Sequence, residues 1–369
     1  MPSNSTEPGA RRSPLWANLL LSALVTLLLF LLVEGFSSLL LATKAARRTL
    51  YMREESHARY DADLGWSHKP AQRVDDLYGP GASFTTNARG FRGREEIDAK
   101  PPAGRYRVIA LGDSFTMGFG VGDEASYPAR LQAACPALQT VNMGQGGYGV
   151  DQNYLWYKRD GVALQSQLLL VAPIAHDFFR MGKDSFTGYP KPVLKIEQAA
   201  LVVKNVPVPP TWHWRTPKLQ VRAFVESLAL ARVARALVFP ARASPPEQFY
   251  GHVSDEVFAA AGLAFDDLAT LSKARGQALV LVYLPVEELL PTEPSREAQW
   301  MEAYARQAQL PFINLVADFQ RLAPAERAAM FRVDKHYSDA GNRLVATALL
   351  RQLGVQVAGF PACPAGAAP

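Results

Sequence analysis

A run of apolar residues that stops at a glycine constrains the fold of this chain more than any other feature. The run Arg107-Val-Ile-Ala-Leu111 is almost wholly aliphatic and leads directly into Gly112-Asp113-Ser114. Such a run is typical of a buried parallel strand that ends in a tight turn. Ser114 would then lie at the carboxyl edge of a sheet, where ligands bind in open α/β folds. Its hydroxyl is a candidate nucleophile, although Asp113 and Ser114 could equally cap the next helix.

The same alternation of short apolar runs with amphipathic stretches continues along the chain. Further strands are predicted at residues 138–143, 168–174, 278–284 and 311–316, and helices at 124–134, 150–160, 254–275, 296–309 and 343–353. Strands that alternate with helices indicate an α/β fold with a doubly wound parallel sheet of five strands.

Composition is that of a globular protein with one large domain. The chain has 369 residues, of which 49% are hydrophobic and 20% are charged, so it can bury a full core. The net charge is +5 and the pI is about 9.1, but lysines and arginines are scattered, without a motif that recognises RNA or DNA. Nucleic acid is therefore not an expected partner.

An apolar segment near the N-terminus predicts a membrane anchor. Ser13 to Val33 carries no charge over 21 positions, and at about 1.5 Å per residue it matches a hydrocarbon core of roughly 30 Å. We predict a transmembrane helix within residues 13–43; a cleaved signal peptide is the alternative. Basic residues are more numerous after the segment than before it, which favours a cytoplasmic domain, but long domains cross membranes largely regardless of charge. We expect a single-pass protein with its catalytic domain in the periplasm or outside the cell.

The region between anchor and first strand contains many turn residues. We expect a juxtamembrane helix to about residue 60, followed by a collar whose segment Asn87-Ala-Arg-Gly-Phe-Arg-Gly93 turns against the catalytic domain. The predicted organisation is a tail at 1–12, the anchor at 13–43, juxtamembrane helix and collar at 44–104, a catalytic domain at 105–358 with an insertion at 178–251, and a tail at 359–369.

A glycine-rich loop follows the second predicted strand. Gly144-x-Gly146-x-x-Gly149 matches the dinucleotide-binding fingerprint, but no acidic residue stands about 20 positions on to hold a ribose, and the loop does not follow the first strand. We interpret it as a loop that brings backbone N–H groups close to a reacting oxygen.

Far downstream, Asp334-Lys-His336 supplies a base and a partner for it. In an extended segment, residues two apart project to the same side, so the Asp334 carboxylate would reach the His336 ring and fix its tautomer. Ser114, His336 and Asp334 would then form a hydrolytic triad. The alternative is a solvated charged turn without a catalytic role.

Taken in order, these motifs resemble a known family. Gly112-Asp113-Ser114, the loop from Asn142 to Gly149, and Asp334-Lys-His336 with Gly341 resemble blocks I, II and V of the SGNH/GDSL hydrolases, over residues 106–353. The resemblance implies a flavodoxin-like three-layer sandwich with the nucleophile after its first strand. Similarity upstream is to membrane-anchored members. An α/β-hydrolase, the main rival, would set its serine in G-x-S-x-G, which Ser114 lacks.

Two departures from the family pattern bear on function. Where block III of the family has an asparagine that supports the oxyanion, this chain has Ala175-His176-Asp177. Block V of the family usually has two residues between its Asp and His, whereas this chain has one, as in the polysaccharide-acetylating branch. We predict that the N–H groups of Ser114 and Gly147 hold the oxyanion and that a ring N–H of His176 replaces the asparagine. Alternatively, His176 packs beneath the insertion without a catalytic part.

The resulting prediction is a membrane-anchored esterase, similar to carbohydrate O-acetyl esterases, that removes a small O-acyl group, acetyl in the first instance, from an acylated carbohydrate or other small ester. A polysaccharide O-acetyltransferase with the same site and a catalytically dead glycan-binding module are the alternatives. Trp212 and Trp214 in the insertion could stack on a sugar or form its small core. Neither a cofactor nor a metal is expected, because His57, His68, His213 and His252 are isolated in sequence.

The chain has two cysteines, Cys135 and Cys363. We predict a disulfide between them, as befits an exported protein; two free thiols are the alternative.

Overall fold

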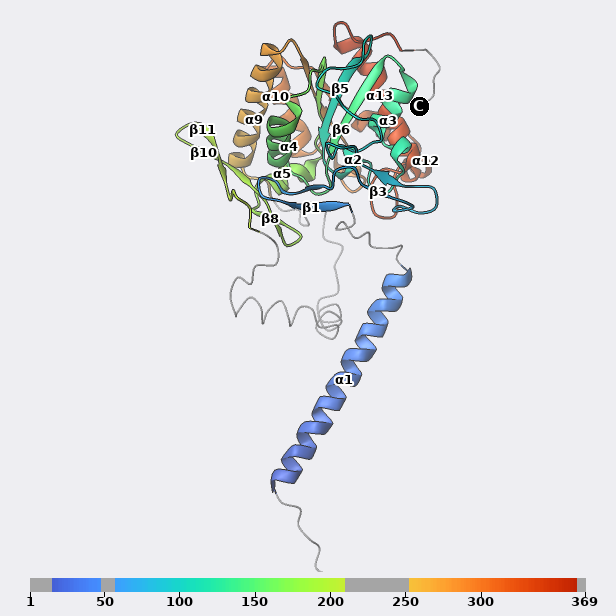
Figure 1. Cartoon of the computed structure of the whole chain (residues 1–369), viewed down its shortest axis with the longest axis vertical. Helices are drawn as coiled ribbons and strands as arrows, with labels where there is room; N and C mark the ends of the chain where they lie inside the picture. Colours follow the sequence, from blue (N-terminus) through green and yellow to red (C-terminus); the bar gives the residue numbers. More distant parts are fainter. Residues whose placement is uncertain (1–14, 48–56, 210–251, 364–369) are drawn as a thin grey trace, which may run out of the picture. The chain divides into compact units, whose positions relative to one another are not determined.

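The computed structural model describes residues 15–47, 57–209 and 252–363 (Figure 1). Helix α1 (Leu15–Arg47) belongs to one compact unit, and the other described residues belong to a second. Within α1, the 25 residues Leu15–Leu39 are apolar enough, and form a helix long enough, to cross a membrane, a test that a signal sequence would also pass.

The second unit is built on a parallel sheet with the strand order β6-β5-β7-β12-β13. This order confirms the predicted five-stranded, flavodoxin-like sheet. The strands are β5 (Tyr106–Gly112), β6 (Leu138–Gly144), β7 (Leu168–Val171), β12 (Ala278–Tyr283) and β13 (Phe312–Asn314). Gly112 pairs with Gly144, and Leu111 pairs with Val171, so the carboxyl ends of β5, β6 and β7 meet at one edge.

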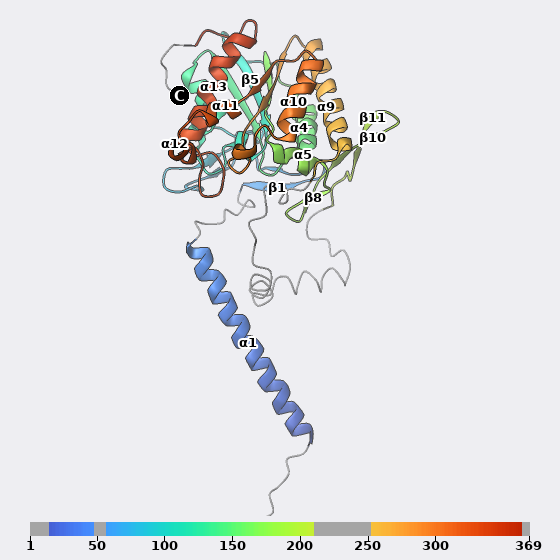
Figure 2. The ribbon, with the colours of Figure 1, turned by 180° about the vertical axis from the view of Figure 1, so that it is seen from behind.

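Helices cover both faces of the sheet (Figures 1 and 2). One face carries α4 (Val150–Trp156), α9 (Asp255–Ala274) and α10 (Arg296–Gln307), and the other carries α3 (Tyr127–Ala134) and α13 (Asp339–Gln356). Residues 108–111 of β5 are completely buried between these layers, which explains their aliphatic character. Shorter helical elements are α2 (Ser114–Met117), η2 (Asp123–Ala125), the π-helix η3 (Tyr157–Gly161), α5 (Ala175–Met181), η4 (Leu290–Thr292), α11 (Val316–Gln320) and α12 (Pro324–Ala329).

The last helix begins earlier than its sequence pattern indicates. The prediction places its start at Arg343, whereas α13 starts at Asp339 because the Ser338 hydroxyl accepts a hydrogen bond from the Gly341 N–H at 3.2 Å. This N-cap adds a turn that lies directly after His336.

The collar contains two small antiparallel pairs, β1 (Ala58–Asp61) with β2 (Gly65–His68), and β3 (Arg73–Val74) with β4 (Phe84–Thr85). The prediction of a helix as far as residue 60 is therefore wrong at its end; residues 48–56 lie outside the described part. The Asp61 carboxylate accepts hydrogen bonds from the Asp63 and Leu64 N–H groups at 3.0 and 3.1 Å, and this local turn favours a hairpin over a helix.

The insertion, predicted at 178–251, begins within α5 and continues as two hairpins. The hairpins are β8 (Ser185–Phe186) with β9 (Tyr189–Pro190), and β10 (Val193–Glu197) with β11 (Ala200–Lys204). A fully buried ion pair between Lys191 and Asp151 attaches them to α4. Residues 217–237, for which the sequence predicts a helix, and both insertion tryptophans, Trp212 and Trp214, lie outside the described residues.

The predicted disulfide is present. Cys135, at the end of α3, is bonded to Cys363, with their Cα atoms 5.0 Å apart. The bond joins two points 228 positions apart in the chain.

Candidate active site

Ser114 is placed by a tight turn at the end of β5. The Asp113 carboxylate caps α2 by accepting a hydrogen bond from the Phe115 N–H at 2.8 Å, and Ser114 is the first residue of that helix. A Cβ at Gly112 would lie 2.0 Å from Oγ1 of Thr116, so only glycine fits the turn. Asp113 thus caps α2, and the adjacent residue, Ser114, is presented at the start of the same helix.

His336 contacts Ser114, although it lies near the C-terminal end of the domain and Ser114 lies near its start. Its Nε2 lies 2.8 Å from the Ser114 hydroxyl. The rings of Phe115 and Phe119 pack on the imidazole, with centroids 5.0 and 4.4 Å away. These contacts hold the ring in reach of the hydroxyl proton, so His336 can act as its acceptor.

Asp334 lies beside His336, but not for the reason that the sequence predicts. The segment is a turn and not an extended strand, because Lys335 has a φ of 72° and the Arg332 N–H donates to the His336 carbonyl at 2.8 Å. The Asp334 carboxylate accepts from the His336 backbone N–H at 3.2 Å and lies 3.5 Å from Nδ1 of the ring.

The Asp334 carboxylate is kept ionised. Burial alone would raise the pKa of Asp334, but the neighbouring His336 and Arg332 hold it below its usual value. Nε of Arg332 donates to the second carboxylate oxygen at 3.3 Å. Asp334 therefore carries the negative charge that would stabilise an imidazolium.

A buried cluster of charged side chains lies behind Ser114. Nη1 of Arg180 donates to the Asp113 carboxylate at 2.8 Å and to the Tyr148 carbonyl at 3.0 Å, and it also contacts Asp177. Burial and the charge of Asp113 raise the pKa of Asp177 well above its usual value. Sequence reasoning missed Arg180, whose only signal is its spacing of three residues from Asp177 on a helix.

Arg180 limits competition for the serine proton. The Ser114 hydroxyl is 3.3 Å from the Asp113 oxygen that Arg180 engages, and 2.8 Å from His336. A hydroxyl donates a single proton, and the shorter contact favours the imidazole.

The glycine-rich loop lies against α2, the helix that begins at Ser114. A Cβ at Gly144 would come within 2.1 Å of the Met117 backbone nitrogen, and Gly147 has a φ of 75°. A Cβ at Gly147 would also lie 2.7 Å from the Phe186 ring of hairpin β8–β9. The loop is therefore a close-packed turn at the sheet edge, roofed by an aromatic ring from the insertion.

His176 follows β7 at this same edge, in the first turn of α5, and is 5% exposed. Burial, with the charges of Arg180 and His336, lowers its pKa to about 3. Its Nε2 lies 3.8 Å from the Glu288 carboxylate. A neutral imidazole at this position can donate one hydrogen bond.

Within the described residues, no group of three or more His, Cys, Asp or Glu side chains is arranged to hold a metal ion. The residues that the structure gathers at the sheet edge are a hydroxyl, two imidazoles, carboxylates and backbone N–H groups, which suit acyl transfer.

Comparisons with known proteins give likeness in structure alone. No protein-family model matches the sequence, and neither does any curated protein. Similar solved structures include an acetylxylan esterase from Geobacillus stearothermophilus, solved as a catalytic mutant, with 17% identity over 69% of this chain and 95% of that one at a TM-score of 0.39. A member of the lipolytic G-D-S-L family from Veillonella parvula has 12% identity over 67% of this chain and 97% of that one, at a TM-score of 0.39. Because identity and TM-score are low, these likenesses carry no argument about function.

Proposed function

We propose that this chain is a serine hydrolase of SGNH/GDSL type that removes a small O-acyl group, such as acetyl, from a carbohydrate. The observation that carries the proposal is the 2.8 Å contact between the Ser114 hydroxyl and Nε2 of His336 at the carboxyl edge of the sheet. The glycine-rich loop and the ionised Asp334 beside this pair supply the remaining parts of such a site.

In the proposed reaction, His336 takes the Ser114 proton as the oxygen attacks the acyl carbon. The N–H groups of Ser114 and Gly147 and the ring of His176 stabilise the tetrahedral oxyanion, while Asp334 stabilises the imidazolium. Collapse of this intermediate expels the sugar hydroxyl with the proton from His336 and leaves an acyl-enzyme. Water, activated by His336, then releases the acid.

Limited access to Ser114 favours a small acyl group. Ser114 is 7% exposed, and Phe186 covers Gly147, the proposed oxyanion donor. An acetyl group needs little room beyond the reacting atoms, whereas a long acyl chain would require an apolar channel. The carbohydrate part of the proposal rests on the family resemblance of the motifs.

A polysaccharide O-acetyltransferase is the second candidate. It would form the same acyl-enzyme and pass the acyl group to a sugar hydroxyl instead of water. The single residue between Asp334 and His336, and a histidine in place of the block III asparagine, support keeping this candidate beside the esterase.

The test uses the full chain in detergent with an acetylated oligosaccharide, with and without an unacetylated acceptor. Acetate release that depends on Ser114 supports the hydrolase, and transfer to the acceptor supports the acetyltransferase. Binding of the glycan without either reaction would contradict both enzymatic candidates and would support a glycan-binding module.

We also propose a single-pass protein whose catalytic domain lies outside the cytoplasm. Helix α1 has the required length and composition, and a disulfide between Cys135 and Cys363 forms in oxidising compartments. The mass of the mature N-terminus distinguishes a retained anchor from a cleaved signal peptide, and protease accessibility in spheroplasts reports the side of the membrane.

A further inference from the structure

We propose that Arg92 of the collar is a positioning residue of the active site, so that the collar is a working part of the catalytic unit. The inference rests on the proposed function. Arg92 lies in a segment that the sequence predicts only as a turn, yet its side chain is 1% exposed. An arginine is rarely buried this far unless specific acceptors surround its guanidinium group.

Its acceptors are the carbonyls at the end of the nucleophile helix. Nη1 donates to the carbonyls of Met117 and Gly118, both at 2.5 Å, and Nη2 donates to that of Val121 at 2.6 Å. A helix of four residues is not stable alone, and the last carbonyls of a helix have no helical partners. Arg92 supplies donors to this end of α2, whose other end presents Ser114.

The loop that Arg92 holds, residues 118–121, also touches the base. Phe119 packs on the His336 ring at 4.4 Å between centroids. A Cβ at Gly120 would lie 2.4 Å from Nε of Arg332, the group that donates to Asp334. One loop therefore contacts the serine helix, the base and the partner of the acid, and Arg92 fixes its backbone.

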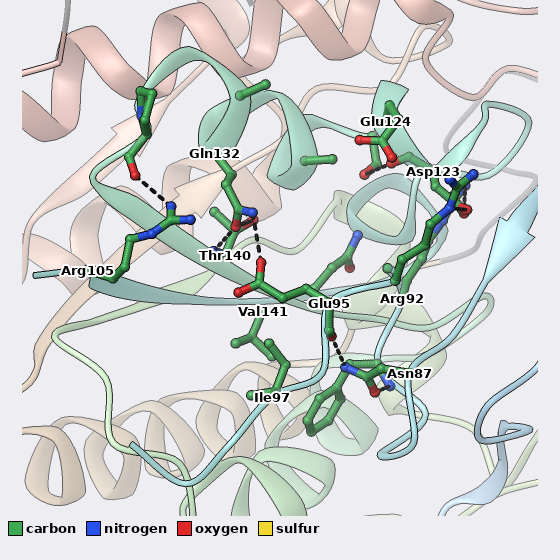
Figure 3. A pocket seen from close by; sticks show the side chains of 18 residues that line it. Asn87, Arg92, Glu95, Ile97, Arg105, Asp123, Glu124, Gln132, Thr140 and Val141 are labelled. Carbon is green, nitrogen blue, oxygen red and sulfur yellow. Dashed lines mark hydrogen bonds and ion pairs between the residues drawn. The ribbon is translucent and has the colours of Figure 1, made fainter. Parts of the chain in front are cut away.

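Contacts to the collar and to the catalytic domain fix Arg92 in turn. Its backbone N–H donates to the Asn142 carbonyl of β6 at 3.2 Å, and its guanidinium lies 4.9 Å from the Phe84 ring and 3.6 Å from the Asp123 carboxylate. Figure 3 shows Arg92 beside Asp123 in the wall of a cavity of about 470 Å³ between the collar and α3. Because the planar guanidinium reaches three carbonyls from two nitrogens, lysine cannot reproduce the contacts.

Arg94 provides a matched control. It lies 3.5 Å from the same Asp123 carboxylate, but its side chain is 56% exposed and no hydrogen bond links it to the nucleophile helix within the described residues. Replacing Arg94 with lysine removes a comparable side chain from the same segment without disturbing residues 118–121.

The experiment compares Arg92→Lys and Arg94→Lys in the full chain in detergent. We expect Arg92→Lys to lower kcat for an activated acetyl ester by about 10²-fold with little change in KM. Labelling of Ser114 by a fluorophosphonate should slow in parallel, and hydrogen exchange should increase at residues 117–121. Arg94→Lys should remain within about twofold of the wild type. A cooperative thermal transition establishes that each variant is folded.

Two outcomes would overturn the inference. The first is a folded Arg92→Lys protein with wild-type kcat and labelling rate. If Arg92→Lys does not fold, Phe119→Ala decides, because it breaks the link between the loop and His336 but keeps the carbonyl contacts; an unchanged kcat in that variant is the second outcome. Failure of the proposed function would be recognised separately, since the wild type itself would then neither turn over the ester nor react with the fluorophosphonate.

Discussion

The Ser114 hydroxyl and Nε2 of His336 are 2.8 Å apart although 222 positions separate the two residues. The start of α13 is held against α3 by the Tyr127 N–H, which donates to the Asn342 side chain at 2.9 Å, and by an ion pair between Arg130 and Asp339. The turn with His336 precedes α13 directly. Packing of α13 on α3 therefore helps to place His336 against Ser114.

Ser114→Ala should reduce hydrolysis of an activated acetyl ester to the uncatalysed rate, because the proposed acyl-enzyme cannot form. His336→Ala should reduce the rate nearly as much. The double variant Ser114→Ala/His336→Ala should be no slower than Ser114→Ala, since the residues of the triad act as a unit. Asp334→Ala should reduce the rate less, because the Asp334 side chain is more exposed than that of His336 and water can take the place of its carboxylate. Ser185→Ala, an exposed serine of the insertion, serves as control; activity that survives in Ser114→Ala would contradict the triad.

His176→Ala should lower kcat by about 10²-fold or more with little change in KM, as expected when one donor to an oxyanion is lost. His176→Asn should restore much of the rate, because an amide can donate from a similar position. Steady-state kinetics of both variants give the answer. A His176→Ala enzyme with wild-type kcat would assign the residue a packing role only.

Buried histidines should make the fold sensitive to acid. Burial lowers the pKa of His57 to about 4 and of His176 to about 3, and holds that of His68 well below its usual 6.5. Since these values are depressed in the folded state, the unfolded chain takes up protons first as the pH falls, and the free energy of unfolding decreases. For one such histidine the loss between pH 7 and pH 5 is about 2 kcal/mol.

Urea unfolding of the wild type and of His68→Asn at both pH values isolates one of these contributions. The asparagine amide can still donate to the Gly90 carbonyl, which lies 3.1 Å from Nδ1 of His68. Buried acids with raised pKa values, such as Asp151 and Asp177, act in the opposite sense but are the same in both proteins. The variant should lose about 2 kcal/mol less than the wild type; an equal loss would mean that His68 is not held neutral.

Removing the disulfide should destabilise the second unit by about 5 kcal/mol, because the bond closes a loop of 228 positions and restricts the unfolded chain. Cys363→Ser tests this by urea unfolding under oxidising conditions. Alkylation followed by mass analysis of protein isolated from cells should find neither thiol free. Two alkylated cysteines in native protein would contradict both the bond and the proposed export.

The parts of the site that follow from local pattern could be predicted from the sequence. Ser114 and the glycine-rich loop lie where apolar runs end, and burial on both faces of a parallel sheet makes those runs easy to recognise. The turn at Asp334 could not be predicted, because a left-handed lysine at position 335 has no sequence signal. The two residues come together by a different geometry from the expected one.

Strand pairing and tertiary contacts account for the other misses. Residues 58–61 form a strand because they pair with Gly65–His68. Helix propensity, which depends on single residues, takes no account of such a pairing partner. Arg92 and Arg180 resemble surface residues in sequence, since their acceptors are carbonyls and carboxylates contributed by distant turns. Burial of an arginine is decided by these tertiary partners.

The hairpins β8–β9 and β10–β11 pair within themselves and share no strand bonds with the central sheet in the described part of the chain. Insertions and deletions in them leave the register of β5, β6 and β7 intact. The hairpins can therefore vary in length and sequence without rebuilding the turn that presents Ser114, as long as Lys191 stays paired with Asp151.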